Sequence, residues 1–283
     1  FRSGVVLVPL GAVNLHDDGV SFDLTARPLF YGAVIPSLWR EVGIGFLGRW
    51  ALASGGRITY EAYAVNGLDA RIADGAGLGA AVGALGEDNN HDKAWVGRLA
   101  WSPRPDVELG LSGYTGNYDA FGHRLSMGNM DVQWRLGGVE LLGELVVAQL
   151  DPGFVQGFPA DSAANTRAAV PDALWGFYAQ VAYHFAIEAL RPHLPEDLRG
   201  TTFAAALRYD GVDTDTGRAS AAGDGRRLTL GVNVRPAEAF VFKVDLSQES
   251  RGVDAERGAH DAWESGFWRR GTRRCMASVA FLF

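Results

Sequence analysis

The 283-residue chain has a single cysteine, Cys275, so neither an intrachain disulfide nor a cysteine-based metal cluster can form. No run of apolar residues approaches the roughly 18 that a membrane-spanning helix needs. Basic residues are in the minority, because 26 Lys and Arg stand against 33 Asp and Glu, and the net charge of −7 offers no basic face to a nucleic acid. If the chain crosses a membrane, it must do so as a β-barrel.

Glycine is abundant (37 residues), aromatic residues reach 11%, and apolar side chains recur at every second position over short stretches. The last stretch, residues 271–283, reads GTRRCMASVAFLF and places Cys275, Ala277, Val279 and Phe281 on one parity. Residues 173–185 (ALWGFYAQVAYHF) show the same alternation over a longer span. This pattern predicts strands that have one apolar face and one face of polar or small side chains.

Segments of about ten residues, the length that crosses a bilayer at a tilt, carry this alternation along the whole chain. They are residues 2–10, 39–50, 57–67, 92–102, 107–115, 126–136, 139–149, 173–185, 201–210, 226–235, 239–249 and 271–283. Residues 186–200, with Pro192 and Pro195, are expected to be an irregular linker and not a strand.

The connections between these segments alternate between long and mostly short. The long ones are residues 12–37, 68–91, 116–125, 150–172, 211–225 and 250–270, and the short ones lie near 54–56, 103–106, 137–138 and 235–238. Short periplasmic turns and longer extracellular loops are typical of membrane barrels. The sequence therefore predicts an all-β fold, a transmembrane antiparallel up-and-down β-barrel with about twelve strands visible, as one domain over residues 1–283.

The terminal pattern Val279-x-Phe281-x-Phe283 resembles the C-terminal signal of bacterial outer-membrane barrels, whose last aromatic residue is read by the assembly machinery and whose last strand closes on the first. VVLVPLGAVNLHDD (5–18), RPLFYGAVIPSLWREVGIG (27–45), YEAYAVNGL (60–68) and DKAWVGRLAWSP (92–103) resemble the phosphate-selective porin O and P type. That family forms barrels of about sixteen strands, which implies further strands before Phe1.

The resemblance implies an outer-membrane porin, a water-filled channel for passive diffusion of small hydrophilic solutes or ions. The alternative is a barrel that sheathes or scaffolds a partner protein in electron transfer or export. A barrel enzyme such as a phospholipase would need a Ser/His pair on the lipid-facing rim. His184 has the luminal parity and no evident serine partner, so an enzyme is not expected, and neither is a cofactor.

Charges of both signs balance on the parity opposite to the lipid face, which favours ion pairs that brace the wall over a field of one sign. In this respect the chain departs from the lysine and arginine ladders of the family that it resembles. The pore-lining or constriction candidates are Arg27, Arg40, Glu41, Arg49, Arg57, Glu61, Arg98, Asp131, Arg135, Arg208, Arg227, Arg235, Lys243 and Arg274. Within residues 12–37, the apolar stretch 29–36 either folds into the lumen as a constriction, with Arg27 and Arg40 facing solute, or packs on the rim.

No metal site is expected, because the six histidines are scattered and the cluster Asn14, His16, Asp17 and Asp18 is interpreted as a solvated acidic turn. Tryptophans near strand ends are expected to anchor at the membrane interfaces. Trp263 and Trp268, beside Arg269 and Arg270, are expected to contact lipopolysaccharide phosphates. The expected location is the bacterial outer membrane, with its lipid and lipopolysaccharide, the barrel assembly machinery and small solutes or ions as partners, and a homotrimer as one candidate assembly.

Overall fold

The structure is a computed structural model that describes residues 1–53, 55–69, 71–72, 77–83, 93–152, 170–217, 223–251 and 271–282. Several predicted features lie outside these residues. They are the terminal Phe283 of the assembly signal and the loop residues Trp263, Trp268, Arg269 and Arg270.

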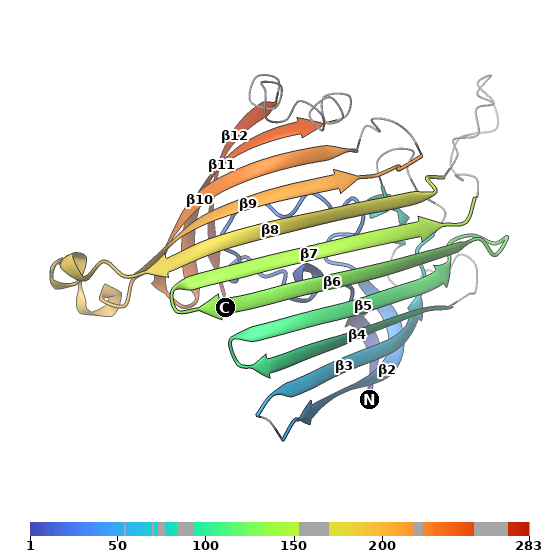
Figure 1. The fold of residues 1–283 in the computed structure, drawn as a ribbon, viewed down its shortest axis with the longest axis horizontal. Coiled ribbons are helices and arrows are strands. Elements are labelled where there is room, and N and C mark those ends of the chain that lie inside the picture. Colours follow the sequence, from blue (N-terminus) through green and yellow to red (C-terminus); the bar gives the residue numbers. More distant parts are fainter. Residues whose placement is uncertain are drawn as a thin grey trace.

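Twelve strands form one antiparallel sheet in which every strand pairs with its neighbours in the sequence (Figure 1). The strands are β1 (Arg2–Leu7), β2 (Arg40–Ala51), β3 (Arg57–Asn66), β4 (Lys93–Arg104), β5 (Val107–Asn117), β6 (Arg124–Leu136), β7 (Val139–Leu150), β8 (Ala173–Phe185), β9 (Thr202–Asp213), β10 (Gly225–Ala237), β11 (Phe240–Arg251) and β12 (Thr272–Phe281). The predicted all-β up-and-down fold is thereby confirmed, and β8 has the predicted bounds.

The first strand is shorter than expected, because it ends at Leu7 and not at residue 10. Pro9, which follows closely, has no backbone N–H to donate to a ladder. Helices are few and short: α1 (Ala12–Leu15), η1 (Gly79–Ala81), η2 (Glu188–His193) and η3 (Glu196–Leu198). The predicted irregular linker contains η2 and η3. Within the described residues, no helix has the length and apolar character needed to span a bilayer.

The short turns lie together at one end of the sheet, on the left of Figure 1. One of them joins β6 to β7, where Leu136 pairs with Val139 across two glycines. Gly137 has a φ of 59°, a left-handed conformation that suits glycine and matches the twist of a two-residue hairpin. We refer to this end as the short-turn end and to the opposite one as the loop end.

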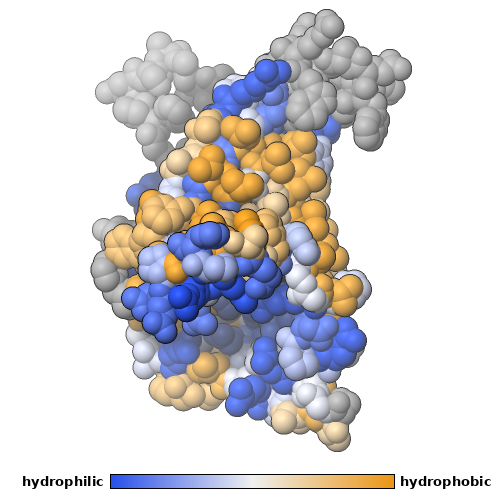
Figure 2. Space-filling view, turned by 90° about the vertical axis from the view of Figure 1, so that its left-hand side faces the viewer, coloured by the Kyte–Doolittle hydropathy of each residue, from blue (hydrophilic) through white to orange (hydrophobic). Residues whose placement is uncertain are grey.

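The sheet is curved, and its two faces differ in character. Large apolar side chains cover the convex face; Phe46 and Trp95 are each 65% exposed and Leu111 is 61% exposed. Their chain neighbours on the other parity point into the concave side and are mostly buried. In the end-on view of Figure 2, hydrophilic side chains gather around a central hollow and hydrophobic side chains flank them. The predicted alternation of side chains is therefore present in the folded chain.

The sheet has two edges. β12 pairs with β11 and β1 pairs with β2, and the described strands contain no ladder between β1 and β12. The closure of the last strand on the first, which the resemblance implies, is thus not seen in the described part of the chain. Val279 and Phe281 of the predicted assembly signal lie on the convex face of β12, 51% and 53% exposed.

Candidate functional site

Residues 8–39, here called the inserted segment, leave β1 and return to β2 on the concave side of the sheet (Figure 1). Sequence reasoning left open whether its apolar part enters the lumen or packs on the rim. Phe30, Val34 and Ile35 are fully buried and belong to the main hydrophobic core, together with residues of β3 to β8. The apolar part therefore packs inside the curve of the sheet.

The tip of the inserted segment, residues 19–26, reaches the short-turn end. Arg235, close to the end of β10, donates to the backbone oxygens of Val20 at 2.5 Å and Phe22 at 3.3 Å. Asn233 of the same strand donates to the backbone oxygen of Asp23 at 3.0 Å. Because Val8 and Trp39 lie near the loop end, where Val8 N–H donates to Trp39 O at 3.0 Å, the segment extends along the length of the concave side.

The concave face of the sheet is here called the wall. Its carboxylates accept hydrogen bonds from the backbone of the limb of the inserted segment that returns to β2. Asp245 of β11 accepts hydrogen bonds from the N–H groups of Thr25 at 2.6 Å and Ala26 at 3.0 Å, and Asp210 of β9 accepts one from Leu29 at 3.2 Å. These N–H groups have no strand partner, and an unpaired buried N–H would cost free energy. Because the acceptors are charged, the bonds are stronger than those to neutral groups.

Close apolar packing completes the attachment. The rings of Phe30 and Tyr178 stack with centroids 6.1 Å apart, and those of Trp39 and Tyr114 approach to 5.0 Å. Gly176 of β8 permits the first contact, because a Cβ at that position would lie 2.3 Å from the Cβ of Phe30. A glycine within this strand thus marks a site where another part of the chain approaches closely.

Tyr31 connects the two limbs of the inserted segment. Its hydroxyl donates to Asp17 at 2.8 Å and accepts from the N–H of Leu38 at 2.8 Å. Burial, and the neighbouring Asp17 carboxylate, raise the pKa of Tyr31 above its ordinary value, although the Leu38 bond acts in the opposite direction. The hydroxyl therefore keeps its proton at neutral pH and remains a donor.

Ion pairs lie within and between strands of the concave face, as the balanced charges predict. Arg98 of β4 makes a two-point contact with Asp131 of β6, with Nη2 2.9 Å from Oδ1 and a shorter bond from Nη1 to Oδ2. Asp210 lies 3.1 Å from Arg208 Nε and 3.4 Å from Arg227 Nε. These arginines brace the wall and present little charge to a solute.

The predicted pore-lining residues fall into groups that differ in exposure. Glu41, Arg98, Asp131, Arg208, Arg227 and Lys243 are buried on the concave face, Arg235 and Glu61 are partly exposed there, and Arg49, Arg57, Arg135 and Arg274 are exposed residues of the same parity. Arg27 lies on the inserted segment, paired with Asp17 at 2.5 Å and placed over the ring of Phe22.

Arg40 does not share the concave face. It opens β2 with the parity of Val42 and Ile44, which are exposed on the convex face, and is itself exposed. The sequence prediction had Arg40 facing solute together with Arg27, but the alternation of side chains along the strand directs it outward with Val42 and Ile44.

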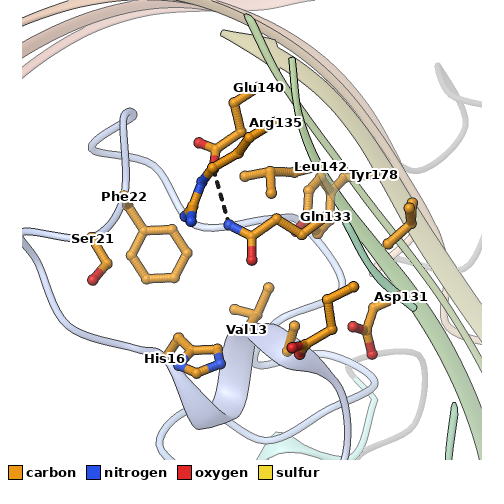
Figure 3. A pocket seen from close by; sticks show the side chains of 13 residues that line it. Val13, His16, Ser21, Phe22, Asp131, Gln133, Arg135, Glu140, Leu142 and Tyr178 are labelled. Carbon is orange, nitrogen blue, oxygen red and sulfur yellow. Dashed lines mark hydrogen bonds and ion pairs between the residues drawn. The ribbon is translucent and has the colours of Figure 1, made fainter. Parts of the chain in front are cut away.

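Two cavities remain between the inserted segment and the wall. The first, of about 220 Å³, lies between Val13, His16 and Phe22 of the segment and Asp131, Gln133, Arg135 and Glu140 of the wall (Figure 3). The second, of about 260 Å³, lies at the short-turn end beside Ser21, Gly138, His184 and Arg235. The two share Ser21, Arg135 and Glu140 in their linings and therefore adjoin each other, and each is large enough to hold water molecules.

Arg235 and Lys243, which bind the backbone of the inserted segment, were among the sequence-predicted site residues, but other attachment residues were not. Asp23, Asn233 and Asp245 hold the inserted segment, and all three are buried. The only indication in the sequence is the concave parity of Asn233 and Asp245 within otherwise apolar strands. Asp23 lies in a segment that has no regular periodicity, so nothing in the sequence points to its partners.

No protein-family model matches the chain. An uncharacterized protein of Aquifex aeolicus (strain VF5) is 26% identical over 262 residues, which cover 88% of this chain and 57% of that protein. The anion-selective porin from Comamonas acidovorans is 11% identical with a TM-score of 0.48, over 89% of this chain and 63% of that porin. A porin refined at 1.8 Å resolution is 12% identical with a TM-score of 0.44, over 85% and 62%.

The chain thus spans a little over half the length of the curated relative that it matches. Both structural likenesses have TM-scores below 0.5 and concern the fold alone.

Proposed function

We propose that the chain forms the wall of an outer-membrane porin whose passage is narrowed by the inserted segment, so that small hydrophilic solutes or ions diffuse through. The two-faced sheet carries this proposal. An apolar convex face suits hydrocarbon, and a concave face of charged side chains suits water. The inserted segment leaves cavities of about 220 and 260 Å³ beside the wall, lined by charged and apolar side chains, and these are the proposed route for solutes.

The position of the inserted segment is also relevant to the alternative function, a barrel that sheathes a partner protein. Residues 8–39 occupy the concave side where such a partner would lie, which supports a channel for small solutes. No enzymatic role is proposed. Membership of the phosphate-selective porin O and P type remains a proposal that rests on the sequence resemblance. The outer-membrane location is likewise a proposal, as are the contacts with lipopolysaccharide, the assembly machinery and further copies of the chain.

Conductance tests the proposal directly. We expect full-length protein, folded in detergent and added to planar lipid bilayers, to produce discrete ion-conducting steps. Reversal potentials under a salt gradient would then give the sign of the selectivity. Folded protein that inserts into the bilayer but never conducts would exclude the porin function.

The orientation of the convex face toward lipid is testable by a charge substitution. Leu111 lies near the middle of β5 and is 61% exposed, so Leu111→Arg would place a cation in hydrocarbon and is expected to cost about 2–4 kcal/mol of stability. Leu136, 63% exposed, lies at the short-turn end of β6, and Leu136→Arg is expected to cost about 0–1 kcal/mol. Unfolding by denaturant in lipid vesicles measures both values, and equal costs would contradict a lipid-facing convex surface.

A further inference from the structure

Three side chains from distant parts of the sequence converge at the short-turn end. They are Asp23 of the inserted segment, Glu140 of β7 and His184 of β8, and their ligand atoms lie within 4.8 Å of one another. His184 Nε2 is 3.4 Å from Asp23 Oδ2 and 3.6 Å from Glu140 Oε2. Both distances exceed the usual length of a hydrogen bond to a carboxylate, but they fit two neighbouring ligands of one small cation.

Each carboxylate is oriented through its other oxygen. Asp23 Oδ1 accepts from Asn233 at 3.1 Å and Arg235 at 3.1 Å. Glu140 Oε1 accepts from Gln133 at 2.9 Å and Arg135 at 2.7 Å. The other oxygens, Asp23 Oδ2 and Glu140 Oε2, are the ones that face the imidazole of His184. Hydrogen bonds of this kind from outside the cluster commonly hold metal ligands in place.

The two carboxylates of this cluster are largely withdrawn from water. The side chain of Asp23 is 2% exposed and that of Glu140 11%, while that of His184 is 36% exposed and lies at the edge of the 260 Å³ cavity. Carboxylate oxygens that are withdrawn from water need a cation or donors in its place. The cavity gives an ion a path to the cluster and leaves room for a water molecule as a fourth ligand.

We propose that Asp23, Glu140 and His184 bind one divalent transition-metal ion of the Zn²⁺ type. One imidazole nitrogen and two carboxylate oxygens form a donor set that suits Zn²⁺ better than the oxygen-preferring Ca²⁺ or Mg²⁺. Sequence spacing could not reveal the site, because the ligands are 117 and 44 residues apart along the chain (140 minus 23, and 184 minus 140). The bound ion would join the inserted segment to β7 and β8.

Isothermal titration of chelator-treated full-length protein in detergent with Zn²⁺ tests this proposal. We expect one ion per chain and at least a tenfold loss of affinity in each of His184→Gln, Glu140→Gln and Asp23→Asn, the usual scale when a ligand shell is damaged. His193→Gln is the matched control, because His193 belongs to the exposed η2 turn, and it should bind as the unmodified protein does. Circular dichroism shows whether each variant keeps its sheet.

Two outcomes would overturn the proposal: no saturable binding of Zn²⁺ by folded protein, or a loss of affinity that is the same in His193→Gln as in His184→Gln. If a variant loses its sheet, titration of the unmodified protein with Co²⁺ is used as the test in its place. Absorption typical of four-coordinate Co²⁺ is expected, and only the spectrum of hydrated Co²⁺ would contradict the site. These measurements need no conductance, so their result is independent of the channel proposal.

Discussion

Replacing Asp131 by alanine is expected to lower the free energy of unfolding by about 3–5 kcal/mol, because the buried guanidinium of Arg98 loses its two-point partner and keeps only the more distant Glu108, at 3.8 Å. The side chains of Arg98 and Asp131 are each 5% exposed, and the pair connects β4 to β6 across β5. Denaturant unfolding in detergent measures the change.

Two further variants separate charge from packing. Replacing both partners by apolar residues of similar size, as in Arg98→Met with Asp131→Leu, should recover most of the loss, since neither charge of the pair then remains buried. Arg57→Ala removes an exposed ion pair, in which Arg57 lies 3.3 Å from Glu108 and is 50% exposed, and should cost less than about 1 kcal/mol. A double variant as unstable as Asp131→Ala would show that shape, and not charge, explains the effect.

The strands could be predicted because their signal is local. Every second residue of β8, from Trp175 to Tyr183, is apolar, and this pattern is sufficient to define a strand and its outer face. The wall charges follow from the same alternation, and Arg98 and Asp131 lie on the concave face as expected. Arg40 was expected to face solute but lies on the convex face, and its position within the predicted strand 39–50 already gives it the parity of Val42 and Ile44.

The path of the inserted segment could not be predicted in the same way. Residues 8–39 have no sustained period, and their backbone is satisfied by side chains far away in sequence. Thr25 and Asp245, for example, are separated by 220 positions. Such contacts depend on the curvature of the completed sheet, which no local pattern encodes. The convergence of Asp23 with Glu140 and His184 is a consequence of the same path.

Shortening the inserted segment is expected to raise the conductance of the channel several-fold. Arg27 and Asp17 form an ion pair at 2.5 Å, so the two limbs lie side by side just before the tip. Residues 19–26 can therefore be removed and replaced by two glycines without pulling the limbs apart. The deletion removes the backbone that Arg235, Lys243 and Asp245 hold. It leaves the apolar packing of Phe30 and Trp39 in place.

The reason for the larger current is geometric. Ion flow through a water-filled passage is limited by its narrowest part, and the tip crosses the concave side at the short-turn end beside both cavities. Single-channel recording measures the conductance, and entry of larger uncharged sugars into vesicles measures the size limit. Replacing residues 189–197 by two glycines is the matched control, because this stretch contains the exposed η2 and η3 turns outside the sheet. An unchanged conductance in the tip deletion, with folding intact, would show that the inserted segment does not narrow the passage.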